Sequence, residues 1–176
     1  MDIIKLKGLY MRAYFVGNMY LSSIAQGIQA AHVLGEMFDK YQHSANQFQD
    51  DTIQTQYLYE WVDLHKTMIL LNGGYSENLH KLYEFFSSEE NPYPFAKFHE
   101  GQDALDGALT SVGIILPDKI YGVDPASVPD ALIFLATYGF YSTTVTDSKT
   151  GYINSYEYTK WELELIQRIS QFGLAR

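Results

Sequence analysis

The sequence predicts a three-layer α/β fold, in which helices flank a mixed four-stranded sheet and an extra hairpin and helix follow at the C-terminal end. Short β-prone runs alternate with stretches of helical periodicity as far as Pro117, which indicates a sheet that is at least partly parallel. The length of 176 residues suits one domain, with residues 11–117 as its core and residues 118–176 as a C-terminal extension. Hydrophobic residues make up 47% and charged residues 19%, a balance typical of globular proteins.

The first strand and the first helix are the elements around which the chain is organised. Met11–Val16 is short, apolar and β-prone, and the Gly17-Asn18 pair ends it. Ser23 is the predicted N-cap of the helix, and Gln26 completes an S-x-x-Q capping box. Apolar residues then recur at helical spacing and form one stripe, made of Ile24, Ile28, Ala31, Leu34, Phe38 and Tyr41. In an amphipathic helix such a stripe is the face that packs on the protein.

The remaining elements of the core follow from periodicity and from turn residues. After a polar loop at Gln42–Asp50 they are a second helix at Thr52–Leu64, a second strand at Lys66–Leu71, a third helix capped by Ser76, a third strand at Phe95–Glu100, an acidic loop at Gly101–Gly107 and a fourth strand at Leu109–Leu116.

The C-terminal extension is harder to interpret. Asp118–Pro129 is predicted to be a loop, and Asp130–Tyr138 is apolar enough to be buried, but periodicity does not decide between helix and strand. Phe140–Tyr156 suggests a hairpin or an ordered loop. A capping box at Thr159–Glu162 predicts a terminal helix with an apolar side that includes Trp161.

Two blocks of sequence carry a family resemblance. The first is Gln29-Ala30-Ala31-His32 on the first helix, and the second is Phe98-His99-Glu100 followed by the fourth strand from Ala108 to Ile114. In order and approximate spacing they resemble the second, archaeal and eukaryotic class of peptidyl-tRNA hydrolases, which carries a Q-x-x-H-A signature at the first block. The resemblance covers residues 11–117.

This resemblance implies an ester hydrolase and a set of catalytic residues. Gln29, His32 and Thr110 match the family's pattern, together with one acidic residue. The family has an aspartate after its third strand and a threonine nearby. Counting back from the fourth strand places Glu100 at the position of that aspartate, whereas a D-x-x-x-T spacing counted back from Thr110 places Asp106 there. The sequence leaves both open, and either carboxylate could serve as a general base.

One position departs from the family. Its lysine at the opening of the first helix is replaced by Ala25, and no lysine occurs between Lys7 and Lys40. The cation that would hold a phosphate or polarise a carbonyl is therefore missing from this helix. Lys97 is a candidate to reach the site in its place.

The opening of the first helix is also a candidate binding site. Asn18, Ser22, Ser23 and Gln26 cluster where the free N–H groups and the helix dipole favour an anion. Each candidate has a structural alternative: His32 could be a half-buried helix histidine that packs on the sheet, and the acidic loop could simply be a solvated surface segment.

Composition excludes several classes of function. The chain has 12 Lys and Arg against 21 Asp and Glu, and a net charge of −9 opposes non-specific attraction to nucleic acid. The absence of cysteine excludes disulfides and thiolate chemistry, and the five histidines show no metal-ligand spacing. No dinucleotide or phosphate-loop glycine motif occurs, so we expect no metal and no cofactor. Without a membrane span or a secretory signal, the expected location is the cytoplasm.

Three functional hypotheses follow. The first is a divergent peptidyl-tRNA hydrolase-like enzyme that cleaves an ester on a tRNA- or nucleotide-linked substrate. The second is a non-catalytic relative that binds a protein or a small ligand. The third is a self-associating protein whose C-terminal helix and Tyr-rich segment form the contact between copies. The expected partners are therefore tRNA or a nucleotide-like ligand, a second copy or another protein, and no membrane. A basic rim around Gln29 would favour tRNA, and an acidic rim would argue against it.

Overall fold

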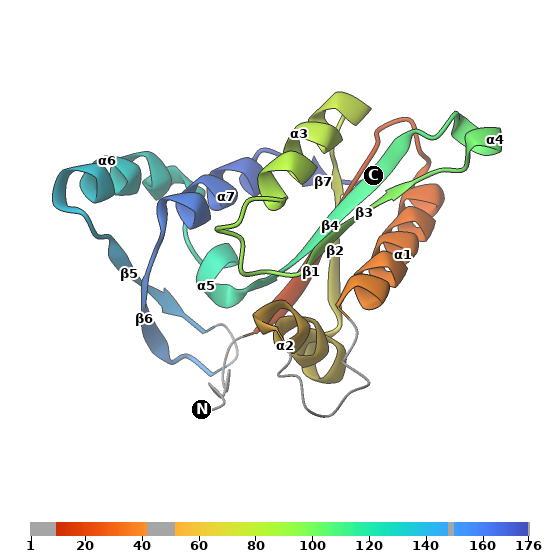
Figure 1. Cartoon of the computed structure of the whole chain (residues 1–176). Helices are drawn as coiled ribbons and strands as arrows, with labels where there is room; N and C mark the ends of the chain where they lie inside the picture. Colours follow the sequence, from red (N-terminus) through yellow and green to blue (C-terminus); the bar gives the residue numbers. More distant parts are fainter. Residues whose placement is uncertain (1–9, 42–51, 148–149, 176) are drawn as a thin grey trace.

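The computed structural model describes residues 10–41, 52–147 and 150–175, and confirms the α/β class. A five-stranded sheet with the order β3-β4-β1-β2-β7 forms its middle layer (Figure 1). The strands of this sheet are β1 (Met11–Gly17), β2 (Thr67–Asn72), β3 (Phe95–His99), β4 (Leu109–Pro117) and β7 (Gly173–Leu174). The four predicted strands are present, and the prediction of a four-stranded sheet is corrected by β7, which pairs with the outer edge of β2.

The sheet is mixed, as predicted. β1 runs parallel to β2 and antiparallel to β4, while β3 is antiparallel to β4. In this register Phe15 of β1 lies opposite Gly113 of β4. A Cβ atom on Gly113 would approach the Phe15 ring to 2.7 Å, so glycine is required where that ring crosses the neighbouring strand.

Helices cover both faces of the sheet, which gives the predicted three layers (Figure 1). The helices are α1 (Ser23–Lys40), α2 (Ile53–Glu60), α3 (Ser76–Phe86), α4 (Gln102–Leu105), α5 (Asp118–Tyr121), α6 (Val128–Tyr138) and α7 (Lys160–Ser170). α1 and α2 pack on the face that carries Ala13 and Phe15 of β1. α3, α5 and α7 pack on the opposite face, with Tyr14 and Val16, because successive strand side chains point to opposite sides.

The apolar stripe predicted for α1 is only in part its buried face, because Leu34, Phe38 and Tyr41 pack partly buried against the core while the first residues of the stripe are exposed. Ile24 and Ile28 are 78% and 52% exposed, while the buried residues of the helix are Gln26, Gln29, Ala30, Val33 and Met37. The helix is thus rotated about its axis relative to the prediction. The N-cap is also one residue earlier: the Ser22 hydroxyl accepts from the Ala25 N–H at 3.2 Å, so the capping box predicted from Ser23 is absent.

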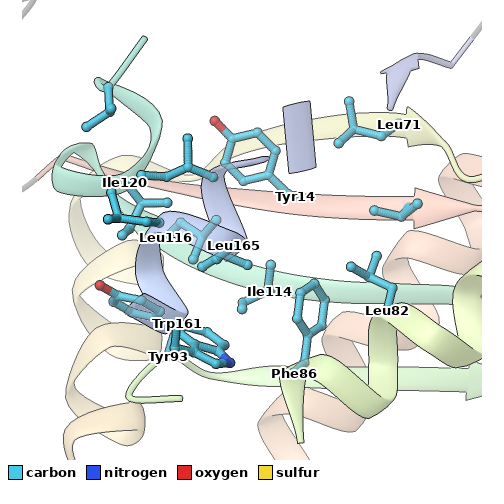
Figure 2. Packing of buried hydrophobic residues seen from close by; sticks show 14 of the residues in the cluster. Tyr14, Leu71, Leu82, Phe86, Tyr93, Ile114, Leu116, Ile120, Trp161 and Leu165 are labelled. Carbon is cyan, nitrogen blue, oxygen red and sulfur yellow. The ribbon is translucent and has the colours of Figure 1, made fainter. Parts of the chain in front are cut away.

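The terminal helix α7 confirms its predicted capping box, in which Thr159 and Glu162 bond reciprocally. Its buried side rests on the sheet through Trp161 and Leu165 (Figure 2). Trp161 lies beside Tyr93, at 6.2 Å between ring centroids. The C-terminal extension is therefore built into the core cluster on this face of the sheet.

Smaller differences concern short elements. The predicted helix at Thr52–Leu64 is present, but its end, Trp61–His65, is a π-helical turn. The acidic loop contains the single turn α4, and the predicted loop from Asp118 contains α5 and the 3-10 turn at Pro125–Ser127. Tyr75, and not Ser76, is the N-cap of α3. The predicted loop at Gln42–Asp50 lies outside the described residues.

The undecided segments of the extension are a helix and a hairpin. Asp130–Tyr138 belongs to α6, and β5 (Ser142–Thr146) pairs antiparallel with β6 (Ile153–Glu157). The expectation that Asp130–Tyr138 is buried is wrong, because in α6 only Val128 and Ala131 are buried. Several of its large apolar side chains point to solvent instead.

Candidate functional site

Three of the predicted catalytic residues meet in one hydrogen-bonded cluster. Gln29 comes from α1, Glu100 follows the last residue of β3, and Thr110 is the second residue of β4. The Thr110 hydroxyl donates to Oε1 of Gln29 at 3.1 Å, and Nε2 of Gln29 donates to Oε1 of Glu100. These contacts join segments that are 81 and 71 residues apart in sequence. We call Gln29, Glu100 and Thr110 the amide cluster.

Burial makes these hydrogen bonds important. Gln29 and Thr110 are 5% and 1% exposed, and Glu100 is half-buried at the rim. A buried amide or hydroxyl without a partner costs about 1–3 kcal/mol, so the cluster fixes the orientation of the Gln29 amide. Its oxygen faces Thr110 and its nitrogen faces the carboxylate.

The structure separates the two candidate carboxylates. Glu100 is in the amide cluster, whereas Asp106 is exposed, adopts a left-handed backbone with φ of 53°, and accepts a hydrogen bond from Gln102. Asp106 therefore caps the single turn α4, and its hydrogen bond stays within the loop. Glu100, chosen by its distance from the fourth strand, thus lies beside Gln29. Asp106, chosen by the D-x-x-x-T spacing, does not.

His32 lies next to the amide cluster without bonding to it. Its ring is exposed and stacks on Phe98 of β3, with 4.4 Å between centroids and 13° between planes. Phe98 was not among the predicted site residues, although its carbonyl lies 3.4 Å from the Thr110 hydroxyl as a second acceptor. His32 thus packs on the strand that carries the cluster, close to the structural alternative foreseen for it.

The polar residues at the opening of α1 mainly build the turn. The Asn18 N–H donates to the Thr110 carbonyl at 2.9 Å, and the Asn18 side chain donates to the Ser76 hydroxyl at 2.8 Å. Ser22 is the N-cap, and Ser23 is exposed in the first turn. Nε2 of Gln26 donates to the Leu21 carbonyl at 3.1 Å, while its Oε1 is buried without a partner among the described residues. These contacts attach the start of α1 to β4 and α3.

Within the described ranges, the lysines and arginines with defined contacts are held away from the amide cluster. Lys40 lies over the Phe95 ring at 3.6 Å and Lys97 over the Tyr83 ring at 4.3 Å. Lys97 therefore does not replace the missing lysine. Ala25, at the position of that lysine, is half-buried one turn before Gln29. The residues after Glu100 add Asp103 and Asp106, so the loop beside the cluster is acidic.

The most voluminous of the described cavities is elsewhere. It has a volume of about 460 Å³ and lies at the end of β2, lined by Asn72, Gly73 and Lys81 among others. No residue of the amide cluster lines it. A second cavity, of about 350 Å³, opens beside Phe98 and is bordered by Glu36 and Asp39 of α1.

The chemistry available to the amide cluster is that of a positioned carboxylate. One oxygen of Glu100 is held by Gln29, and the described residues give its other oxygen no hydrogen bond. That oxygen can accept a proton from water or from a ligand hydroxyl. Gln29 keeps a second N–H that takes no part in the hydrogen bonds of the cluster.

The described ranges contain neither a candidate metal site nor a candidate membrane span. No group of three His, Asp or Glu side chains there could hold a metal ion. No helix among the described residues is both long and apolar enough to cross a bilayer. Comparison of the sequence with models of known protein families gives no match, and comparison with curated proteins gives none either.

Proposed function

We propose that the chain is an ester hydrolase, a divergent relative of class II peptidyl-tRNA hydrolases, with Glu100 as its general base. The observation that carries the proposal is the hydrogen-bonded chain from Thr110 through Gln29 to Glu100. Three residues that the family resemblance selects from distant parts of the sequence converge in it. A nucleotide-linked ester is a better substrate than a whole tRNA, because binding many phosphates requires basic side chains that the cluster lacks.

The proposed reaction uses the free oxygen of Glu100. This oxygen takes a proton from water as the water oxygen attacks the ester carbonyl carbon. The second N–H of Gln29 donates to the carbonyl oxygen as negative charge develops on it. The intermediate then breaks its bond to the alkoxide leaving group, which recovers the proton from Glu100, so the products are an acid and an alcohol. Thr110 acts as a positioning residue that holds the Gln29 amide.

The test compares the two carboxylates on two substrates. Purified wild-type protein, Glu100→Gln and Asp106→Asn are assayed with a peptidyl-tRNA and with an N-acyl-aminoacyl ester of adenosine. Loss of a general base costs about 10²–10⁴ in rate, so Glu100→Gln should lower kcat/KM by that factor. Asp106→Asn is the matched control and should leave kcat/KM unchanged. Full activity in Glu100→Gln, or no cleavage of either ester by the folded wild type, would overturn the proposal.

A gain-of-function variant tests the role of the missing lysine. Ala25→Lys places a cation one turn before Gln29 and should raise peptidyl-tRNA cleavage more than adenosine-ester cleavage. The gain should shrink as salt is added, because screening weakens phosphate contacts. Ile24→Lys adds the same charge to the exposed side of the helix and should give a smaller gain.

A second candidate function is binding without catalysis. It is favoured by Tyr20, Ile24 and Ile28, which leave 76%, 78% and 52% of their surfaces exposed around the opening of α1. Apolar side chains exposed close together often mark a binding surface. In this case wild-type protein would cleave neither ester, and it would bind an apolar fluorescent dye that Ile28→Asp binds more weakly.

A further inference from the structure

Helix α6 exposes a surface that has the composition of a protein interior. Ile133, Phe134 and Tyr138 are 67%, 41% and 63% exposed, and Phe140, just beyond the helix, is 58% exposed. Phe134 contacts both Tyr138 and Phe140, with ring centroids 4.5 and 5.9 Å apart. We call these four residues the α6 face. Figure 1 shows α6 with β5 and β6 at the end of the molecule opposite α1 and α4.

The sequence around this face is uncharged. Residues 131–146 contain no Asp, Glu, Lys or Arg, although the whole chain carries a net charge of −9. A helix that is apolar around most of its circumference is normally buried. Fully burying one large apolar side chain contributes about 1.5–3 kcal/mol, so leaving this face in water forgoes a large stabilisation. The amino-acid composition of α6 is typical of a helix that other elements cover on both sides, whereas in this fold the rest of the chain covers only one side of it.

We propose that the α6 face is the docking surface for a second copy of this chain, with the two α6 helices packed about a two-fold axis. A two-fold contact brings the same residues together from both copies and requires a self-complementary surface. An uncharged apolar face meets this requirement. Two copies that each carry −9 repel one another over most of their surfaces, and the least repulsion is expected where no charge faces its own image.

The exposed apolar area of the α6 face sets the expected affinity of the dimer. An aromatic side chain buries about 150–250 Å² when fully covered, so the exposed parts of the α6 face amount to roughly 400 Å² per copy. This is about half of the ~800 Å² per partner of a standard interface. The dimer should therefore be reversible, with dissociation visible in the micromolar range.

The hairpin that follows α6 is held by the rest of its own chain. β5 and β6 form a separate two-stranded sheet, and Val145 of β5, which is 3% exposed, belongs to the core cluster. The proposed docking surface is therefore confined to the α6 face. The inference uses no residue of the amide cluster and does not depend on the proposed hydrolysis.

The experiment is analytical ultracentrifugation of the full chain from low to high micromolar concentration. Wild-type protein should pass from monomer to dimer, and Ile133→Glu should stay monomeric because it would bring two carboxylates together in the contact. Ile24→Glu is the matched control, since Ile24 is equally apolar and 78% exposed on another helix. It should dimerise like the wild type. A monomeric wild type, an undiminished dimer in Ile133→Glu, or loss of the dimer in Ile24→Glu would overturn the proposal.

A second measurement covers the case in which Ile133→Glu fails to fold. The chain contains no cysteine, so a single introduced cysteine can form a disulfide only between two copies. Ile133→Cys and Thr137→Cys lie one turn apart on α6, and Ile24→Cys is the control. Under mild oxidation at least one of the α6 variants should form a covalent dimer well in excess of the control. Equal cross-linking at all three positions would contradict docking through α6.

Discussion

Replacing Glu162 by Gln should destabilise the fold more than any exposed charge change, because four hydrogen bonds converge on this buried carboxylate. Nζ of Lys119 donates to both oxygens at 2.7 and 2.8 Å, the Tyr93 hydroxyl donates at 2.7 Å, and the Thr159 N–H donates at 3.0 Å. Burial and the charge of Glu162 raise the pKa of Tyr93, so this hydroxyl keeps its proton and remains a donor. Glu162 itself is 4% exposed.

The expected loss of stability in Glu162→Gln follows from the number of hydrogen bonds that a glutamine side chain can accept. Glutamine is tolerated in a capping box, so the helix start is preserved, but its amide has one acceptor oxygen where the carboxylate has two. The charge of Lys119 is left without its counterion. Breaking a buried ion pair costs about 3–5 kcal/mol, and we expect about 3 kcal/mol because the Lys119 side chain is 21% exposed. For a chain of this size the loss lowers the Tm by roughly 6–12 °C.

Urea unfolding measures this loss against a control on the same helix. The Lys160 and Glu164 side chains pair at 3.6 Å and are 74% and 33% exposed. Glu164→Gln should therefore change the free energy of unfolding by less than about 1 kcal/mol. In a double-mutant cycle, Glu162→Gln and Lys119→Met should together cost less than the sum of their separate effects. A Glu162→Gln variant no less stable than Glu164→Gln would refute the buried-pair reasoning.

Two further predictions concern stability. Burial raises the pKa of Asp118 above 3.8, so the native state holds this proton more tightly than the unfolded state, and stability falls as pH rises from 3.8 through the raised value. Asp118→Asn removes that loss, and its urea midpoint should exceed the wild type's at pH 7 but match it near pH 3. Gly73→Ala should cost about 1–3 kcal/mol, because the new Cβ would lie 2.6 Å from both Leu79 and Val16. Gly35→Ala, with open space on α1, should instead stabilise by about 0.5–1 kcal/mol, and equal thermal shifts in the two variants would contradict the packing argument.

Much of the strand and helix order could be predicted from the sequence, but the orientation of α1 could not. Periodicity assigns Ile24 and Ile28 to the core because they are apolar, and assigns Gln29 to the surface because it is polar. In the fold Gln29 is buried, since Thr110 and Glu100 supply its hydrogen bonds from other elements. A buried amide is stable only with such partners, and a local pattern contains no information about contacts 71 or 81 residues away.

The family resemblance supplied what periodicity lacked at the candidate site. It selected Gln29, Glu100 and Thr110, which lie together. It also selected His32, which stacks on Phe98 without joining them, and Asp106, whose hydrogen bond stays within its loop. The two-residue strand β7 is too short to give a periodic pattern in the sequence, and only its pairing with β2 defines it.

The sequence predicts that Asp130–Tyr138 of α6 is buried because its residues are apolar. Since apolar helices are normally buried, the exposure of α6 is the observation that indicates a docking surface.

The aromatic side chains of the chain hold many of its positive charges. Five of the described lysines and arginines lie over aromatic rings: Arg12 over Tyr121, Lys40 over Phe95, Lys97 over Tyr83, Lys119 over Tyr158, and Arg168 over Phe85. Moving such a cation onto a phosphate forgoes a ring contact of about 0.5–2 kcal/mol. These positive charges are therefore held by the framework, while the loop after Glu100 contributes only carboxylates among its charged groups. For the proposed hydrolysis, this charge distribution favours a small ester over a polyanion such as a whole tRNA.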